Sequence, residues 1–231
     1  MFFARNSAAK KNYLPYIAPR TLVPVNMPAH RESVPARIGP KLRVLGVDPA
    51  VAGATGYGIV EFERPGAAAK LVRFGAVKLP QRATFAARLR EIHRLIESLV
   101  QEFAPDAVAV ESVFTALNVK TALRLAEMRG VVLLAAAQAQ IPAHRYSPRE
   151  VKASVVGFGG ASKLQVQQMV SSLLGLSVCP EPADASDALA IALCHANVSR
   201  ARDRLAAATA VKPIAPKLHG RIRAARAGIL P

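Results

Sequence analysis

The chain has 231 residues, 52% of them apolar, with a formal net charge of +16 and two cysteines. The length excludes two large domains, the charges that interrupt every apolar segment exclude a membrane-spanning helix, and the cysteine usage excludes a secreted disulfide scaffold. The positive charge predicts a surface that attracts polyanions, either nucleic acid or anionic lipid.

Both ends of the chain are basic. Residues 1–41 contain six prolines and a single acid, Glu32, which predicts a flexible Pro-rich extension. This acid-poor composition also matches that of an organelle transit peptide. Residues 201–231 carry many Arg and Lys and one acid, Asp203, so we expect a basic tail that adds non-specific DNA affinity. Residues 42–200 are then the core domain.

The first half of this core begins with a predicted strand. Residues 41–48 form an apolar run that ends at Asp48. A Gly-rich stretch follows, and then residues 59–63 and 71–77 predict two further strands in antiparallel succession. Apolar residues recur at three- and four-residue spacing from about Arg82 to Phe103, which indicates an amphipathic helix.

The second half repeats this alternation. Residues 107–111 predict a buried strand closed by Glu111, followed by a helix over 117–138 and a fifth strand over 141–146. Capping-box spacings then predict the starts of two helices, and an alanine-rich helix runs from Ala183 to about Ser199. The sequence therefore predicts an α/β fold with a mixed five-stranded sheet flanked by helices. The two capping boxes are Ser147 with Glu150 and Ser162 with Gln165.

Four carboxylates stand out in these elements. Asp184 and Asp187 are three residues apart, so on a helix they share a face; they are either ligands of one cation or an N-cap and a first-turn acid. Asp48 and Glu111 each close an apolar strand, where a carboxylate is costly unless it is paired or bound to metal. This pattern predicts a site for divalent cations. Two such ions about 4 Å apart support phosphodiester hydrolysis.

A series of short motifs, in one order over roughly residues 42–200, resembles the RuvC family of crossover-junction endodeoxyribonucleases. The ordered set is far more specific than any one motif. The motifs are Gly46 to Pro49 with Thr55 to Gly58, Val110 to Phe114, Arg129 with Gly130, Val151 with Lys152, Val156 to Gly159, Lys163 with Gln165 to Gln167, and Ala183 to Ala192.

The resemblance implies a ribonuclease-H-like fold, a homodimer and a dependence on Mg²⁺ or Mn²⁺, with two ions in each active site. It implies paired nicks across a four-way Holliday junction during DNA recombination and repair. The partners would be junction DNA and a branch-migration motor complex of the RuvA and RuvB type, with no membrane. We expect a bacterial cytoplasm, with a plastid or mitochondrion as the alternative because of the N-terminal composition.

Carried over position by position, Asp48, Glu111, Asp184 and Asp187 match the family's catalytic metal ligands. Phe114 matches an aromatic residue that stacks near the junction centre. Lys152 and Lys163 match basic residues that bind DNA near the scissile phosphate, and Lys163 is also a catalytic candidate. The turn after Asp48 is one residue longer than is usual in the family, so we expect a reshaped hairpin there.

Two other interpretations remain. In the first, the chain is a non-catalytic basic protein that binds branched DNA, and its acids are structural. In the second, the opening strand and Gly-rich hairpin belong to an ATP-using protein of the actin and sugar-kinase type. That class needs a duplicated second domain, for which this chain lacks the length.

Overall fold

A computed structural model describes residues 41–51, 53–63, 68–78, 80, 82–112 and 118–209. Residues 1–40 of the predicted N-terminal extension, Phe114 and the chain beyond residue 209 lie outside these ranges, whereas Lys41 is the first residue of a strand. The chain divides into two units, Met1–Pro35 and Ala36–Pro231, and the fold described below belongs to the second.

The core of this unit is one mixed sheet of five strands in the order β3-β2-β1-β4-β5. The meander β1-β2-β3 is antiparallel, whereas β1, β4 and β5 run parallel to one another. The predicted α/β fold with a mixed sheet is therefore confirmed. The strands are β1 (Lys41–Asp48), β2 (Thr55–Glu63), β3 (Lys70–Val77), β4 (Ala107–Glu111) and β5 (Ala143–Tyr146).

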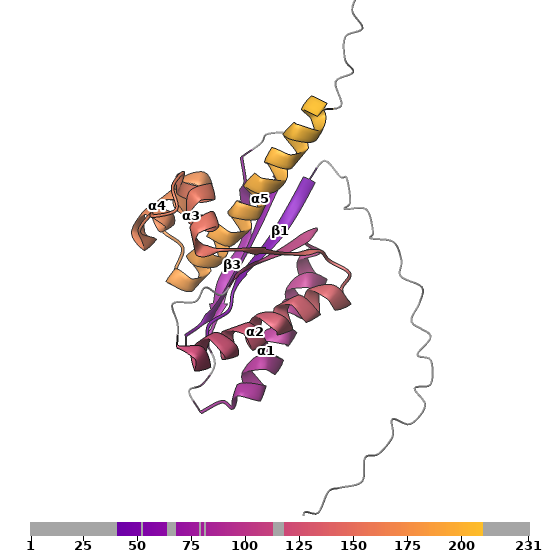
Figure 1. Ribbon diagram of the computed structural model, residues 1–231, viewed down its shortest axis with the longest axis vertical. Coiled ribbons are helices and arrows are strands. Elements are labelled where there is room, and N and C mark those ends of the chain that lie inside the picture. Colours follow the sequence, from indigo (N-terminus) through magenta and orange to yellow (C-terminus); the bar gives the residue numbers. More distant parts are fainter. Residues whose placement is uncertain are drawn as a thin grey trace, which may run out of the picture. The chain divides into compact units, whose positions relative to one another are not determined.

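Helices cover both faces of the sheet (Figure 1). On one face α1 and α2 pack over β1 and β4, and on the other face α5 lies across the sheet with α3 and α4 beside it. No helix in the described part of the chain combines the length and apolarity needed to cross a bilayer. The helices are α1 (Phe85–Phe103), α2 (Val119–Gln138), α3 (Pro148–Val156), α4 (Lys163–Leu173) and α5 (Ala183–Thr209).

Most element ends agree with the sequence to within three residues. The strands β1 and β4 have the predicted bounds, and both predicted capping boxes are formed, at Ser147 and at Ser162. The helix expected from Arg82 begins at Phe85 instead, because the hydroxyl of Thr84 accepts a hydrogen bond from the amide of Ala87 and caps it.

The Gly-rich stretch lies partly within the second strand and not wholly before it, contrary to the sequence prediction. The strand β2 begins at Thr55 and so includes Gly56 and Gly58. These glycines belong to the sheet because α5 packs directly on its backbone. A Cβ at Gly56 would lie 1.9 Å from the carbonyl oxygen of Asp184, and a Cβ at Gly46 would lie 2.1 Å from that of Ala188. Hydrogen is the only side chain that fits between them.

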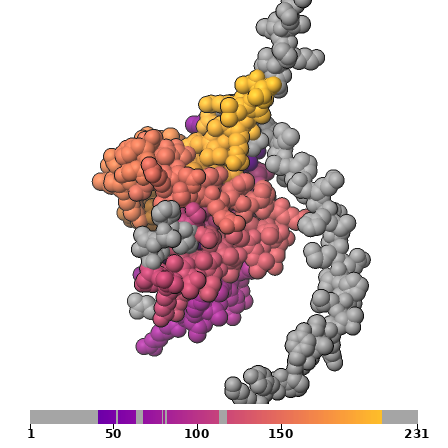
Figure 2. Space-filling model, viewed as in Figure 1, coloured from indigo at the N-terminus to yellow at the C-terminus, as the bar shows by residue number. Residues whose placement is uncertain are grey.

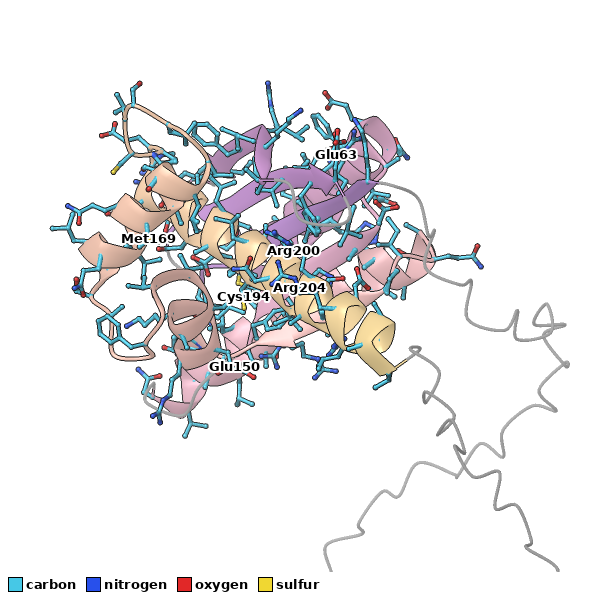
Figure 3. The ribbon with its side chains drawn as sticks, turned by 90° about the horizontal axis from the view of Figure 1, so that it is seen from above. Glu63, Glu150, Met169, Cys194, Arg200 and Arg204 are labelled. Carbon is cyan, nitrogen blue, oxygen red and sulfur yellow. The ribbon has the colours of Figure 1, made fainter. Side chains whose placement is uncertain are left out.

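A second correction concerns α5, which continues to Thr209 rather than ending near Ser199. Residues 201–209 are exposed, so no core pattern marks this part of the helix in the sequence. Their alanines, arginines and leucine are strong helix formers. The start of the predicted basic tail is thus helical, and Figure 3 shows Arg200 and Arg204 on this part of α5, beyond Cys194.

Candidate active site

The site begins with two strands that end at the same edge of the sheet. In the parallel ladder between β1 and β4, Val47 is opposite Val110, so the last residues of both strands, Asp48 and Glu111, follow side by side. The residues before them are fully buried, whereas both acids are partly buried. The buried strands thus hold two carboxylates at the rim of the core.

The other two acids come from the first turns of α5. Asp184 is the second residue of this helix and lies within it, so it is not the N-cap. Ala185 and Ala188 are completely buried against the sheet, whereas Asp184 and Asp187 are only partly buried. The close approach of α5 to Gly56 places its first turn beside the end of β1. Three separate elements therefore bring the four predicted acids near enough for the charges of Glu111, Asp184 and Asp187 to act on Asp48.

Two lysines complete the site. The ammonium Nζ of Lys163 donates a hydrogen bond of 2.6 Å to Oδ2 of Asp187. Both Lys163 and Lys152 line a cavity of about 240 Å³ together with Asp48, Glu111 and Asp187. The acid Asp184 does not line this cavity, although its charge reaches Asp48.

The rest of the cavity wall is apolar, and sequence reasoning missed it. A usable signal was helical spacing: Ala190 follows Asp187 by three residues, and Val166 follows Lys163 by three residues. These residues therefore share a helix face with a predicted site residue. The other lining residues are Pro148, Val151 and Ile191.

Burial and neighbouring charges raise the pKa of the two acids at the strand ends. Burial, followed by the charges of Glu111, Asp187 and Asp184, raises the pKa of Asp48 from 3.8 to about 8, against the opposing charge of Lys163. Burial and the charge of Asp187 likewise raise the pKa of Glu111, while Lys152 and Lys163 oppose this shift. The two lysines thus offset only part of the repulsion, and the cluster is short of positive charge.

A divalent cation suits this donor set. Carboxylate oxygens are the ligands that Mg²⁺ and Mn²⁺ prefer, and a cation would supply the missing positive charge. Among the described residues, no three His, Cys, Asp or Glu side chains are close enough together to hold one ion. One carboxylate oxygen of Asp187 accepts the hydrogen bond from Lys163. The chemistry of these oxygen donors fits such an ion.

A further polar group of α5, His195, does not join the site. It is buried, and its Nδ1 lies 2.7 Å from the hydroxyl of Tyr146. Its ring stacks on that of His144. His195 is therefore a packed histidine between α5 and β5.

The raised pKa of Asp48 predicts how stability changes with pH when no metal is bound. The folded protein holds this proton more tightly than the unfolded chain does, so the free energy of unfolding falls as pH rises from about 4 toward about 8. Asp48→Asn removes this titration and should be the more stable protein at the upper end, by a few kcal/mol at about 1.4 kcal/mol per pKa unit. Urea denaturation of both proteins in chelator, at the two ends of this range, measures the difference. Parallel pH profiles would contradict the prediction.

The fold and the site together define a class. A mixed five-stranded sheet with acids at the ends of β1 and β4, and more acids on the helix packed across it, is the arrangement of the ribonuclease-H-like class. Over residues 44–195 the sequence matches the family described as crossover junction endodeoxyribonuclease RuvC. The chain belongs to this family, whose nucleases are metal-dependent.

Individual relatives agree with this assignment. The crossover junction endodeoxyribonuclease RuvC of Syntrophomonas wolfei is 46% identical over 154 residues, which are 67% of this chain and 88% of the relative. The solved structure of Thermus thermophilus RuvC has a TM-score of 0.65 at 36% identity and covers 70% of this chain and 97% of its own. A second structure, of the same bacterium's RuvC in complex with a Holliday junction substrate, has a TM-score of 0.61 at 33% identity, with 69% and 96% covered.

Proposed function

We propose that this protein resolves Holliday junctions by paired, metal-dependent nicks during DNA recombination and repair. One observation carries the proposal: acids from β1, β4 and α5 meet at one edge of the sheet, beside a cavity that they share with Lys152 and Lys163. The family assignment supplies the junction as the substrate, and the net charge of +16 favours a polyanion.

Asp48, Glu111, Asp184 and Asp187 would hold the metal, which we take to be two Mg²⁺ ions, with Mn²⁺ as a substitute. When bound, the ions would activate a water molecule and stabilise the leaving 3′ oxygen of the scissile phosphodiester. The ammonium groups of Lys152 and Lys163 would bind phosphate oxygens at the mouth of the cavity, because each lies beside the acids while Lys163 remains 58% exposed.

Paired nicks need two active sites, which we attribute to a homodimer. Three large apolar side chains of α2 are exposed: Val119 by 75%, Leu123 by 59% and Leu134 by 52%. Their spacings of four and eleven residues place them along one stripe of the helix. The helix α2 itself lies at the surface in Figure 2. A second copy of this chain, with its own α2, is the partner that would cover this stripe.

The further partners that we propose are a branch-migration motor complex of the RuvA and RuvB type. The proposed location is the bacterial cytoplasm, by analogy with the bacterial relatives. The N-terminal residues that suggested an organelle lie outside the described residues.

The decisive experiment incubates the purified full-length protein with a synthetic four-way junction and with linear duplex of matched sequence. Each is tested with Mg²⁺ and with chelator and read on a denaturing gel. Symmetric nicks in the junction alone, and only with metal, are the expected result. Binding without cutting under any divalent metal would instead favour the non-catalytic interpretation.

Lys163 offers a test of the lysine roles. We expect Lys163→Ala to slow cutting by about ten- to a hundredfold, because its ammonium group both orients Asp187 and binds phosphate. Single-turnover rates at saturating protein separate this effect from weaker binding. The matched control is Lys70→Ala, which removes an exposed lysine. Lys70 lies on β3, the edge strand on the far side of the sheet from β5. Equal rates for the two variants would exclude a role for Lys163 in the chemistry.

A further inference from the structure

Two arginines, Arg129 and Arg145, lie near the end of the sheet at which Asp48 and Glu111 end β1 and β4. Neither arginine has an assigned role. In the parallel ladder between β4 and β5, Arg145 is opposite Val110 and Tyr146 is opposite Glu111. Arg145 is therefore the penultimate residue of the edge strand β5. Its backbone lies one strand spacing, about 4.8 Å, from that of β4, which ends at Glu111.

The alternation of side chains along β5 shows which face Arg145 occupies. The ring of His144 stacks on His195 of α5 at 4.2 Å, whereas Ala143 packs against the core cluster beneath α2. Residues two apart in a strand share a face, so Arg145 points to the side of α2. On that helix Arg129 follows Met128, which is buried in the same cluster, and is itself partly buried.

The two guanidinium groups are close enough to repel each other. Burial, and then the charge of Arg145, lowers the pKa of Arg129. Within the described ranges neither arginine side chain forms a hydrogen bond or an ion pair, whereas the side chains of Arg43 and Arg94 on other surfaces pair with Glu61 and Glu91. An anion between Arg129 and Arg145 would relieve this repulsion.

We propose that Arg129 and Arg145 together bind one backbone phosphate of the DNA strand that passes the active site. A phosphodiester suits the pair because planar guanidinium groups bind phosphate oxygens through paired hydrogen bonds. The position beside Glu111 suits a phosphate that neighbours the scissile one on the same strand. The inference rests on the proposed function for the identity of that strand.

The test compares the double variant R129Q/R145Q with wild type and with Arg73→Gln. Arg73 is an exposed arginine on β3, the opposite edge strand of the same sheet, so its loss removes a charge far from the proposed site. The dissociation constant for a fluorescent four-way junction is measured in chelator over a series of salt concentrations. Thermal melting and sedimentation monitor folding and oligomeric state.

We expect the double variant to lower the slope of log affinity against log salt by about 0.9, the value for one phosphate contact. The slope for Arg73→Gln should stay near that of wild type. Equal slopes for the two variants would overturn the inference. A double variant that changes only its melting temperature or its oligomeric state would overturn it too, because the pair would then serve folding or an interface.

Cutting by the wild type, measured alongside, separates this inference from the proposed function. If the wild type cuts junctions while the slopes are equal, the phosphate site fails and the function stands. If the slope falls while the wild type does not cut, the phosphate site stands and the nuclease function fails.

Discussion

Replacement of Asp48 by Asn is expected to abolish cutting of the four-way junction while binding of the junction persists or becomes tighter. Asp48 ends the central strand β1 and is the acid on which the charges of the other three converge. Its loss should therefore reduce the single-turnover rate by more than the roughly 100-fold that follows when an outer partner of a metal site is removed. Removal of a negative charge near the DNA favours binding.

The control for this variant is Glu102→Gln. It neutralises an exposed acid on α1, away from the end of the sheet at which Asp48 and Glu111 lie. It should cut at the wild-type rate. Gel-shift titration in chelator measures binding, and thermal melting measures folding. An unfolded Asp48→Asn protein would mean that this acid is structural, and a variant that still cuts would remove Asp48 from the chemistry.

The second large effect is expected at Gly56. A methyl group there would lie 1.9 Å from the main-chain oxygen of Asp184, so Gly56→Ala must push the first turn of α5 away from the sheet. Overpacking of this kind costs about 3 kcal/mol, and here it also displaces two of the acids. We therefore expect both a lower midpoint of urea denaturation and a loss of cutting at temperatures where the variant is still folded.

A matched control lies three residues earlier. A Cβ at Gly53 would lie 3.5 Å from the Cβ of Ala50, which is an ordinary contact. Gly53→Ala should therefore unfold close to the wild-type midpoint. If the two glycine variants unfold at the same urea concentration, the close packing of α5 on the strand is not what requires glycine at position 56.

The sequence was most informative where function and local pattern coincide. An apolar run that ends at an acid predicted β1 and β4 with their observed bounds, because a buried strand and its first polar residue are adjacent in the chain. The starts of α3 and α4 were predicted equally well, since a capping box needs only residues three apart.

The features that the sequence did not predict depend on tertiary contacts. Glycine is normally a mark of turns, so the pattern predicts the second strand only over residues 59–63, after Gly56 and Gly58, and not over the observed range under a helix. The ion pair between Lys163 and Asp187 joins residues 24 positions apart, so no local sequence spacing predicts it. The helical end of α5 carries no apolar period because no described part of the chain covers it.

The contact between α5 and the sheet also bears on which genetic changes can compensate for one another. At Gly58 the two nearest atoms, at 2.6 and 2.7 Å, belong to the side chain of Leu189, and the third is the main-chain nitrogen of Leu189 at 3.0 Å, so a smaller residue at position 189 relieves most of the clash of an alanine at position 58. At Gly56 and Gly46 the nearest atoms are carbonyl oxygens, which every amino acid carries. A second substitution in α5 can therefore restore the folding of a Gly58 variant. For variants at Gly56 and Gly46, only reversion to glycine restores the contact.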